Sequence, residues 1–257
     1  MRDGSAVRAG TFPYEGDGLV TGWHSHDLHQ IEYALAGTVE VETSAGHYLL
    51  PPQQAAWIPA QLPHRTTINR RVKTVSVFFH PDMVADPGDK ARILAAAPVI
   101  REMIRYATRW PIDRLQSDEE ADRFFTVLAD LVSNGLDQEA PLHLPTSTDP
   151  VIAAVMAYTD DHLVQVTASE VSRAVGLSDR SLRRQFRAAV GMSWHRYLVH
   201  ARLLRAMVLL AEPSWSVLGV ATEVGFGSVS AFSRAFALHT GETPTAYRGR
   251  IASSPSP

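Results

Sequence analysis

The sequence contains no cysteine. That absence excludes disulfide frameworks, thiolate zinc sites, iron–sulfur clusters and cysteine nucleophiles, so any bound metal must take histidine and oxygen ligands. The chain also lacks any run of the roughly eighteen apolar residues that a membrane helix needs, and the opening segment MRDGSAVRAG has no signal-peptide core. We therefore expect a cytoplasmic protein with no membrane partner.

Lysine is missing from the C-terminal part of the chain. Residues 1–145 carry 13 Lys+Arg against 19 Asp+Glu, whereas residues 146–257 carry 11 against 8, and all 11 are arginines. The mildly basic C-terminal part is compatible with phosphate contact, although a solvated arginine face gives the same count. A length of 257 residues with 45% hydrophobic content predicts two folded domains.

Short β-branched or aromatic runs, separated by Gly and Pro, fill residues 21–81: HQIEYALAG, TVEVETSAG, HYLLPP, AAWIPA and VKTVSVFF. Such spacing is typical of a small antiparallel barrel or sandwich. We predict an α+β chain of two domains. The first is an antiparallel β-barrel at residues 1–85, and the second is all-α.

Helical periodicity begins near Asp86, and we expect a helical segment over residues 86–140 that dimerises the chain. Within it, Ser117 followed by Glu120 predicts a capping box, and Gly135 predicts a helix end. A proline-containing stretch at residues 141–149 predicts a linker, and residues 251–257 predict a frayed tail.

The C-terminal part contains an internal repeat. The segments VSRAVGLSDRSLRRQFRAAVGMSWHRY and VATEVGFGSVSAFSRAFALHTGETPTAY superpose with one extra residue in the second turn. Each copy reads as a short helix, a glycine (Gly176 or Gly225), a turn, and a second helix with apolar residues at i and i+4. This pattern predicts two helix-turn-helix motifs, with Ser178 and Ser228 capping the second helices.

The surfaces of the two second helices differ in charge. The residues that fall off the apolar stripes are Arg180, Arg183, Arg184 and Arg187 in the first helix, and Val229, Ser230, Ser233 and Arg234 in the second. We expect the first set to carry more of the affinity for double-stranded DNA. The long apolar helix between the copies is able to hold the two motifs about 34 Å apart, one turn of B-DNA.

The block from Val151 to Arg250, and above all ATEVGFGSVSAFSRAFALHTGETPTAYR, resembles the AraC/XylS family of bacterial transcription regulators. The resemblance implies a seven-helix DNA-binding domain over residues 150–250 in which one chain reads two adjacent major-groove segments. RNA polymerase is then a further candidate partner. The resemblance assigns base contacts to Arg180, Arg183, Arg184, Val229, Ser230, Ser233 and Arg234, and core roles to Phe226, Phe232, Phe236, Pro244 and Tyr247.

Histidines mark a candidate site in the β domain. On a strand, His24 and His26 would point to the same side, in phase with Gln30, and His64 follows a proline-rich turn. This segment resembles the cupin barrel, with Gln30 where that family usually has Glu, and Gln61 where it has Gly. In metal-binding cupins these positions supply three imidazoles and one carboxylate.

Two interpretations of these residues stay open. In one, His24, His26 and His64, with Gln30, hold a divalent metal, and Glu32 is an alternative acidic ligand. In the other, they line a pocket for an organic effector or are hydrogen-bonded barrel residues. No cofactor is assigned with certainty.

These features together predict a sequence-specific transcription regulator, a homodimer that responds to a small molecule or metal in its barrel. Effector binding would shift the population between two arrangements of the DNA-binding domains. The alternative is a cupin-type metal-dependent enzyme with an accessory DNA-binding domain, but no carboxylate accompanies the histidines. An architectural protein would instead bind DNA by charge alone, with steep salt dependence and little sequence preference.

Overall fold

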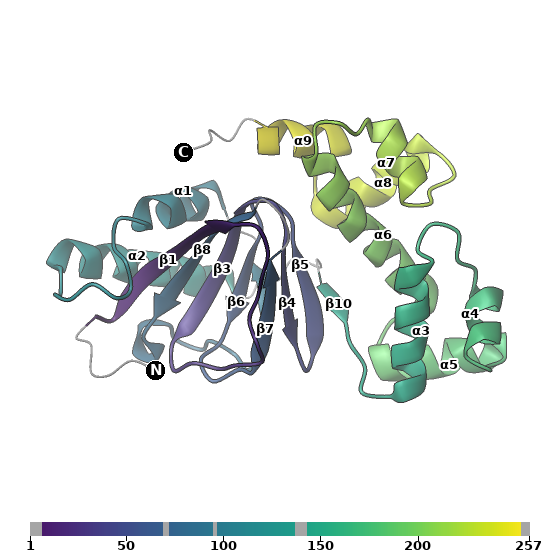
Figure 1. Cartoon of the computed structure of the whole chain (residues 1–257), viewed down its shortest axis with the longest axis horizontal. Coiled ribbons are helices and arrows are strands. Elements are labelled where there is room, and N and C mark those ends of the chain that lie inside the picture. The colour runs from purple at the N-terminus through teal and green to yellow at the C-terminus, as the bar shows by residue number, and fades with distance from the viewer. Residues whose placement is uncertain (1–6, 69–71, 95–96, 137–142, 253–257) are drawn as a thin grey trace. The chain divides into compact units, whose positions relative to one another are not determined.

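The chain folds as two compact units (Figure 1). The structure is a computed structural model that describes residues 7–68, 72–94, 97–136 and 143–252. The first unit comprises Met1–Ser44 and Tyr48–Pro141, and the second comprises Ala45–His47 and Leu142–Pro257. Within the described ranges, every helix is too short or too polar to cross a membrane.

The strands form two five-stranded sheets, in the orders β1-β8-β3-β6-β9 and β10-β5-β4-β7-β2. Their bounds are Ala9–Gly16 (β1), Leu19–Val20 (β2), His29–Ala36 (β3), Val39–Thr43 (β4), Gly46–Leu50 (β5), Ala55–Ile58 (β6), His64–Ile68 (β7), Val72–Phe79 (β8), Arg92–Leu94 (β9) and His143–Pro145 (β10). The predicted antiparallel, jelly-roll-like fold is confirmed, although the described strands form two sheets rather than one closed barrel. The five runs predicted as strands are β3, β4, β5, β6 and β8, whereas β1 and β7 were not predicted.

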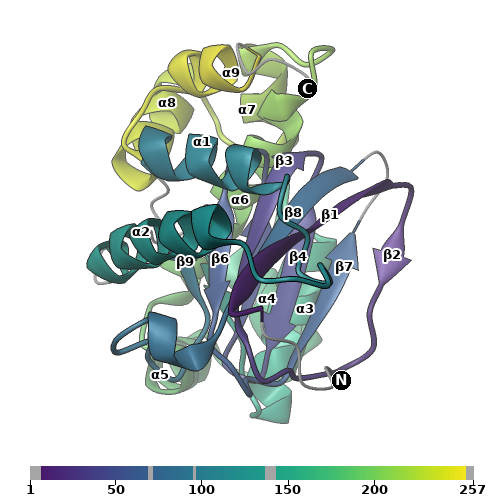
Figure 2. The ribbon, with the colours of Figure 1, turned by 90° about the vertical axis from the view of Figure 1, so that its left-hand side faces the viewer.

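Two helices, α1 (Pro98–Ala107) and α2 (Glu119–Gly135), cover one face of the first sheet (Figure 2). Their apolar residues, among them Ile104, Phe125 and Leu128, share a core with residues of β3, β6 and β8. Trp57 of β6 is fully buried in this core. The helical segment therefore stabilises the sheet by burying its apolar face.

Side-chain alternation along β3 separates two environments. Ile31 and Tyr33 belong to the core beneath α1 and α2. Gln30 and Glu32 have the opposite parity, so their side chains point away from those helices. Glu32 pairs with Ser76 across the antiparallel register with β8. Buried polar side chains thus occupy the face of the sheet that lies away from the helices.

Two local predictions in this unit were wrong. Residues 92–94, predicted as helical, form β9, because their backbone pairs with β6, with Ile93 opposite Ala56. The cap of α2 is Asp118, whose carboxylate accepts from the backbone N–H groups of Glu120 and Ala121. Asp118 also accepts from the Trp110 indole N–H, a tertiary contact that Ser117 does not make in the described contacts.

The second unit holds seven helices within the described residues. They are Pro150–Asp161 (α3), Ala168–Ala174 (α4), Asp179–Val190 (α5), Trp194–Ala211 (α6), Val217–Glu223 (α7), Val229–Thr240 (α8) and Pro244–Ala252 (α9). One hydrophobic core joins α3, α4, α5 and the start of α6. A second set of aromatic contacts joins Phe232, Phe236 and Tyr247 of α8 and α9. The internal repeat therefore folds as two similar halves that share α6.

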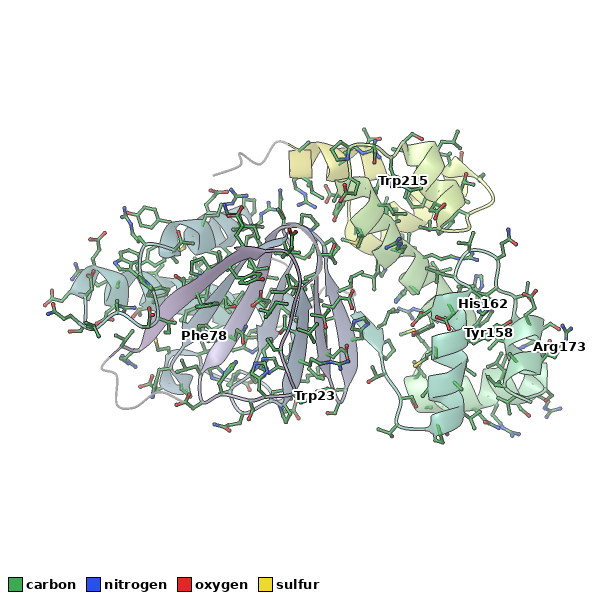
Figure 3. All side chains as sticks on the ribbon, viewed as in Figure 1. Trp23, Phe78, Tyr158, His162, Arg173 and Trp215 are labelled. Atoms are coloured by element: carbon green, nitrogen blue, oxygen red, sulfur yellow. The ribbon has the colours of Figure 1, made fainter. Side chains whose placement is uncertain are left out.

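Both predicted helix-turn-helix motifs form, α4–α5 and α7–α8. The hydroxyl of Ser178 accepts from Ser181 N–H, and that of Ser228 accepts from Ala231 N–H. Gly176 and Gly225 both have a positive φ, of 70° and 80°, which a residue with a side chain rarely adopts. Near the first motif, the Tyr158 and His162 rings stack at the end of α3 (Figure 3).

The segment between the units differs from its prediction in one place. Residues 143–145 of the expected linker 141–149 form strand β10, and Asp149 caps α3. Residues 141 and 142 lie outside the described residues, as do residues 253–257 of the expected frayed tail. The described tail residues, Ile251 and Ala252, still belong to α9.

Candidate effector site and candidate DNA interface

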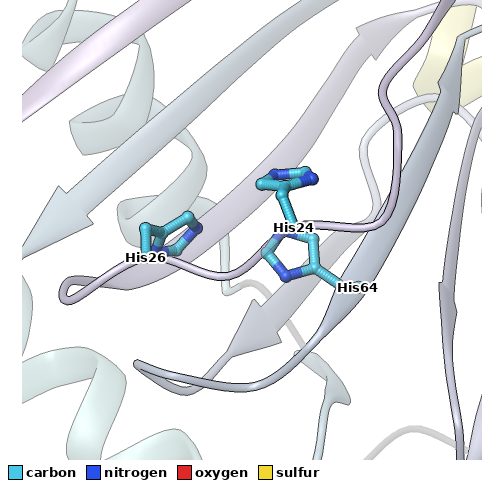
Figure 4. Close-up of side chains that lie close together, drawn as sticks. All are labelled: His24, His26 and His64. Atoms are coloured by element: carbon cyan, nitrogen blue, oxygen red, sulfur yellow. The ribbon is translucent and has the colours of Figure 1, made fainter. Parts of the chain in front are cut away.

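Three of the predicted site residues, His24, His26 and His64, lie together in the first unit (Figure 4). His64 begins β7, and its backbone N–H and C=O both pair with those of His24, at 2.9 and 3.0 Å. The Gln61 N–H donates to the His26 carbonyl at 2.8 Å. The assumption that His24 and His26 share a strand was wrong: both lie in the loop before β3, which backbone bonds hold against β7.

All three imidazoles are oriented in the same way. Each Nδ1 faces a backbone carbonyl two residues away: His24 that of Gly22 at 2.8 Å, His26 that of Leu28 at 2.7 Å, and His64 that of Leu62 at 2.9 Å. Because a carbonyl only accepts, Nδ1 is the donor in each ring, which leaves Nε2 as the nitrogen turned away from the backbone. This is how metal-ligating histidines are normally held.

The potential ligand atoms of the three histidines lie within 4.8 Å of one another. The rings of His24 and His64 are 4.3 Å apart, and those of His26 and His64 are 5.1 Å apart. His64 is fully buried, and its Nε2 has no hydrogen-bond partner among the described residues. Three imidazole nitrogens grouped in this way could hold a single metal ion.

The pKa of His64 is lowered to about 4, mainly by burial; the nearby His24 and His26 act in the same direction, and the Leu62 carbonyl opposes the shift. His64 is therefore neutral at physiological pH. A neutral imidazole is the form that binds a metal or accepts a hydrogen bond.

Gln30 connects this histidine cluster to a buried carboxyl. Its Oε1 lies 2.7 Å from Nε2 of His26, and its Nε2 donates to Glu32 Oε2 at 2.9 Å. The Ser76 hydroxyl donates to the same Glu32 oxygen at 2.5 Å. Burial raises the pKa of Glu32, and the hydrogen bonds from Ser76 and Gln30 oppose that rise.

The fourth predicted residue therefore touches the cluster through His26 alone, and Glu32 lies one hydrogen bond further away. Glu32 is not among the grouped ligand atoms. The sequence spacing correctly placed Gln30 and Glu32 on the same side of β3. It did not reveal that Gln30 links His26 to Glu32 by hydrogen bonds.

The candidate DNA contacts of the first motif are exposed on α5. Leu182 and Phe186 are fully buried in the first helical core, which turns the rest of the helix outward. The exposed arginines are Arg180, Arg183, Arg184 and Arg187. Three of them, Arg180, Arg183 and Arg184, line an open hollow with Asp179. A cationic surface at a helix N-terminus suits phosphates and guanine edges.

The second motif has the same frame and a less charged surface. Phe232 and Phe236 of α8 are fully buried. Ser230 and Arg234 are exposed, whereas Val229 and Ser233 are partly buried. The structure thus leaves all four predicted residues of α8 at least partly accessible, with one arginine among them.

Sequence reasoning missed Arg202, near the middle of α6. Its guanidinium donates to the backbone carbonyls of Leu163, Val164 and Gly225, at 2.9, 3.0 and 3.0 Å. Nothing in the sequence distinguishes it from Arg205 three positions later, which is exposed. Only the helical phase relative to the buried residues of α6 separates the two.

Comparison with known protein families identifies both units. Residues 10–144 match the model of the AraC-like ligand binding domain, which is more than half of the chain. Residues 171–250 match a helix-turn-helix domain.

Individual relatives agree with the family matches. The chain is 27% identical over 247 residues to the HTH-type transcriptional regulator NimR of Escherichia coli K12, covering 95% of this chain and 86% of NimR. It is 33% identical over 114 residues to the transcriptional activator RhaS of Klebsiella pneumoniae, covering 44% of this chain and 39% of RhaS.

Among solved structures, the DNA-binding domain of AdpA in complex with a target DNA is 32% identical, with a TM-score of 0.37 over 38% of this chain and 90% of that one. The fatty-acid-bound structure of ToxT from Vibrio cholerae is 11% identical, with a TM-score of 0.41 over the whole of both chains. The two family matches show that this chain belongs to the AraC family of DNA-binding transcription regulators, with a ligand-binding domain followed by a helix-turn-helix domain.

Proposed function

We propose that this regulator senses a divalent first-row transition metal ion through Nε2 of His24, His26 and His64, and reads promoter DNA through α5 and α8. The observation that carries the metal assignment is the orientation of the three rings. Each Nδ1 donates to a backbone carbonyl, which leaves Nε2 as the candidate ligand atom of each ring, and the potential ligand atoms of the three histidines lie within 4.8 Å of one another. Three imidazoles suit zinc, nickel, copper or iron.

Gln30 makes metal binding an exchange of partners. Its Oε1 accepts a hydrogen bond from Nε2 of His26, so a metal must replace that proton and displace the amide. The freed amide stays within reach of Glu32 and Ser76, on strands that form the first sheet. Metal binding would thereby change contacts on β3 and β8 and shift the population between two arrangements of this unit.

Titration of the purified chain, stripped with a chelator, tests the metal assignment. We expect Zn²⁺, Ni²⁺ or Co²⁺ to bind at one equivalent, and His64→Ala to weaken binding by more than about 100-fold. His80→Ala is the matched control, because His80 is an exposed histidine paired with Asp82. Equal affinity of wild type and His64→Ala, or no binding to wild type, would contradict the assignment.

An organic effector is the second candidate. The observation that favours it is the buried polar set Gln30, Glu32 and Ser76, which is joined by hydrogen bonds on the face of the sheet away from α1 and α2. Mass spectrometry of small molecules released from the purified chain tests this alternative. A released compound whose retention requires Glu32, and which binds in the presence of a chelator, would favour the organic effector.

We propose that the site senses its ligand without turning it over. The relatives are regulators, and Glu32, which Gln30 links to His26, is buried and hydrogen-bonded instead of open to a substrate. Catalytic conversion of a bound compound by the metal-loaded chain would support the alternative, a metal-dependent enzyme.

The DNA contacts are assigned to the eight residues predicted above. Their support is exposure on α5 and α8 beside buried anchor residues. Selection of duplexes from a randomised library by the purified chain tests this assignment. Enrichment of a defined sequence supports it, and uniform binding that falls steeply with salt would favour an architectural role.

The remaining proposals concern assembly and location. Residues 86–140 are proposed to dimerise the chain, because Val99, Tyr106 and Val127 of α1 and α2 expose about half of their surfaces. Sedimentation of wild type and Val127→Lys tests this.

RNA polymerase is a proposed partner, and the cytoplasm is the proposed compartment.

A further inference from the structure

Arg202 links two segments of the DNA-binding unit that are far apart in sequence. Its Nε and Nη2 groups donate to Leu163 and Val164, in the loop between α3 and α4. Its Nη1 donates to Gly225, in the turn between α7 and α8. One side chain on α6 therefore holds the entry of the first helix-turn-helix motif and the turn of the second.

The second turn lies directly against the first loop at this point. A Cβ on Gly225 would lie 2.1 Å from the Val164 carbonyl oxygen and 2.9 Å from Nη2 of Arg202. Gly225 also has a φ of 80°. The position thus requires glycine both for its backbone conformation and for the close approach.

The helices of both motifs also contact α6. Trp194, Tyr197 and Leu198 belong to the first core. Phe232 and Phe236 lie among the aromatic side chains of the second half. The orientation of α8 relative to α5 depends on contacts that cross between the halves, and the Arg202 bonds cross at that boundary.

We propose that Arg202 is a positioning residue that sets the spacing between the two half-sites which one chain reads. The proposal rests on the proposed reading of DNA by both α5 and α8. Arginine suits the role because its guanidinium is planar, stays charged and directs several donors in fixed directions. Lysine offers a single ammonium that does not reproduce the fork.

The consequence for DNA is geometric. Successive base pairs in B-DNA rotate by about 35°, so inserting one or two pairs between half-sites turns the second groove away from α8. A chain with rigidly held motifs then loses one set of contacts. A chain whose motifs rotate freely tolerates the insertion.

The test uses the full chain and a duplex that the wild type selects from a randomised library, together with derivatives carrying one or two base pairs inserted between the half-sites. We expect wild type to lose at least about 10-fold in affinity on insertion. For Arg202→Met we expect about 10-fold weaker binding at the native spacing. For this variant, we further expect the ratio of the affinity for the native duplex to the affinity for an inserted duplex to fall to near one.

Two variants separate positioning from general damage. Arg205→Met removes an exposed arginine of the same helix and should behave as wild type. Arg202→Lys keeps the charge and should resemble Arg202→Met in its spacing ratio; it also serves as the test variant if Arg202→Met fails to fold by circular dichroism.

The outcomes distinguish this proposal from the proposed function. Binding by the Arg202 variants that is unchanged, or weakened equally at every spacing, would overturn the positioning role. Selection of a single half-site by wild type would also overturn it, while DNA reading by one motif would stand. Absence of any selected sequence would contradict the DNA reading itself.

Discussion

The second helices of the two motifs, α5 and α8, are held by the same kinds of residues, which we call their frame: a serine cap, two buried anchor residues and a final glycine. Their exposed surfaces differ. Each is capped by a serine and is anchored by two fully buried residues, Leu182 and Phe186 in one, Phe232 and Phe236 in the other. Each also ends at a glycine with a left-handed backbone. On this common frame α5 exposes four arginines, whereas α8 exposes Ser230 and a single arginine, Arg234. The repeat therefore preserves how a helix is held and varies what it contacts.

Because of this difference, we expect the two motifs to contribute unequally to the affinity for DNA and to sequence discrimination. Arginines release counterions from DNA and bind phosphates or guanines, so α5 should supply most of the affinity. The smaller side chains of α8 add sequence discrimination at lower charge. Matched substitutions of the buried residues and serine caps should therefore have equal effects in α5 and α8. Matched substitutions of the exposed residues should have unequal effects on DNA binding.

The largest effect is expected in the frame. Phe186→Ala and Phe236→Ala should each lower the free energy of unfolding by about 3–5 kcal/mol, because each removes a fully buried ring. Thermal unfolding and a gel shift measure the loss of stability and of DNA binding. A strongly unequal pair of values would break the claim that the two motifs share one frame.

The surface of α5 should come next. Arg184→Ala should weaken binding to the cognate duplex by about 1–3 kcal/mol and relax discrimination at one base pair, if this exposed arginine reads a base. Ser230→Ala on α8 is the matched comparison and should weaken binding less. Uniform weakening of Arg184→Ala across all sequences would instead identify a phosphate contact.

The serine caps should contribute less than the arginines. Ser178→Ala and Ser228→Ala each remove an oxygen that accepts a backbone N–H at 3.2 Å. Each should lower stability by about 1 kcal/mol. Calorimetry of both variants measures this loss. If only one of the two substitutions lowered stability, the two helices would differ in how their N-termini are held.

An effect no larger than that of one serine cap is expected from pH. The pKa of His239, in the last turn of α8, is lowered to about 4, mainly by burial and in smaller part by His200 and Arg196 on α6. The unfolded chain therefore binds this proton more readily, so stability falls as pH drops from about 6.5 toward 4. His239→Gln should remove about 1 kcal/mol of that loss at pH 5, after allowance for solvent screening. An identical pH dependence of melting in wild type and variant would contradict this.

The sequence predicted the parts of the fold that depend on local pattern. Serine caps, glycines at the turns and apolar residues at i and i+4 identified both helix-turn-helix motifs, and a run of β-branched and aromatic residues identified β8 as a strand. The prediction failed where a tertiary partner decides. Residues 92–94, an arginine followed by two apolar residues, carry no local signal for a strand, and only pairing with the neighbouring β6 makes them one.

The candidate sites show the same limit. The spacing of His24, His26 and His64 correctly indicated a cluster, but the backbone bonds between His24 and His64 that assemble it join residues 40 positions apart. Arg202 carried no signal at all, because its partners are backbone carbonyls. Every residue has a backbone carbonyl, so such a partner cannot be recognised from the residue type in the sequence.

The most direct test of the account is a hydroxyl-radical footprint of the full chain on a duplex that it has selected. We predict two protected segments centred about 10 base pairs apart, one turn of the helix, with substitution of Arg184 weakening one segment and substitution of Arg234 weakening the other. A single protected segment, or protection that does not depend on sequence, would contradict the claim that one chain reads DNA with both helices.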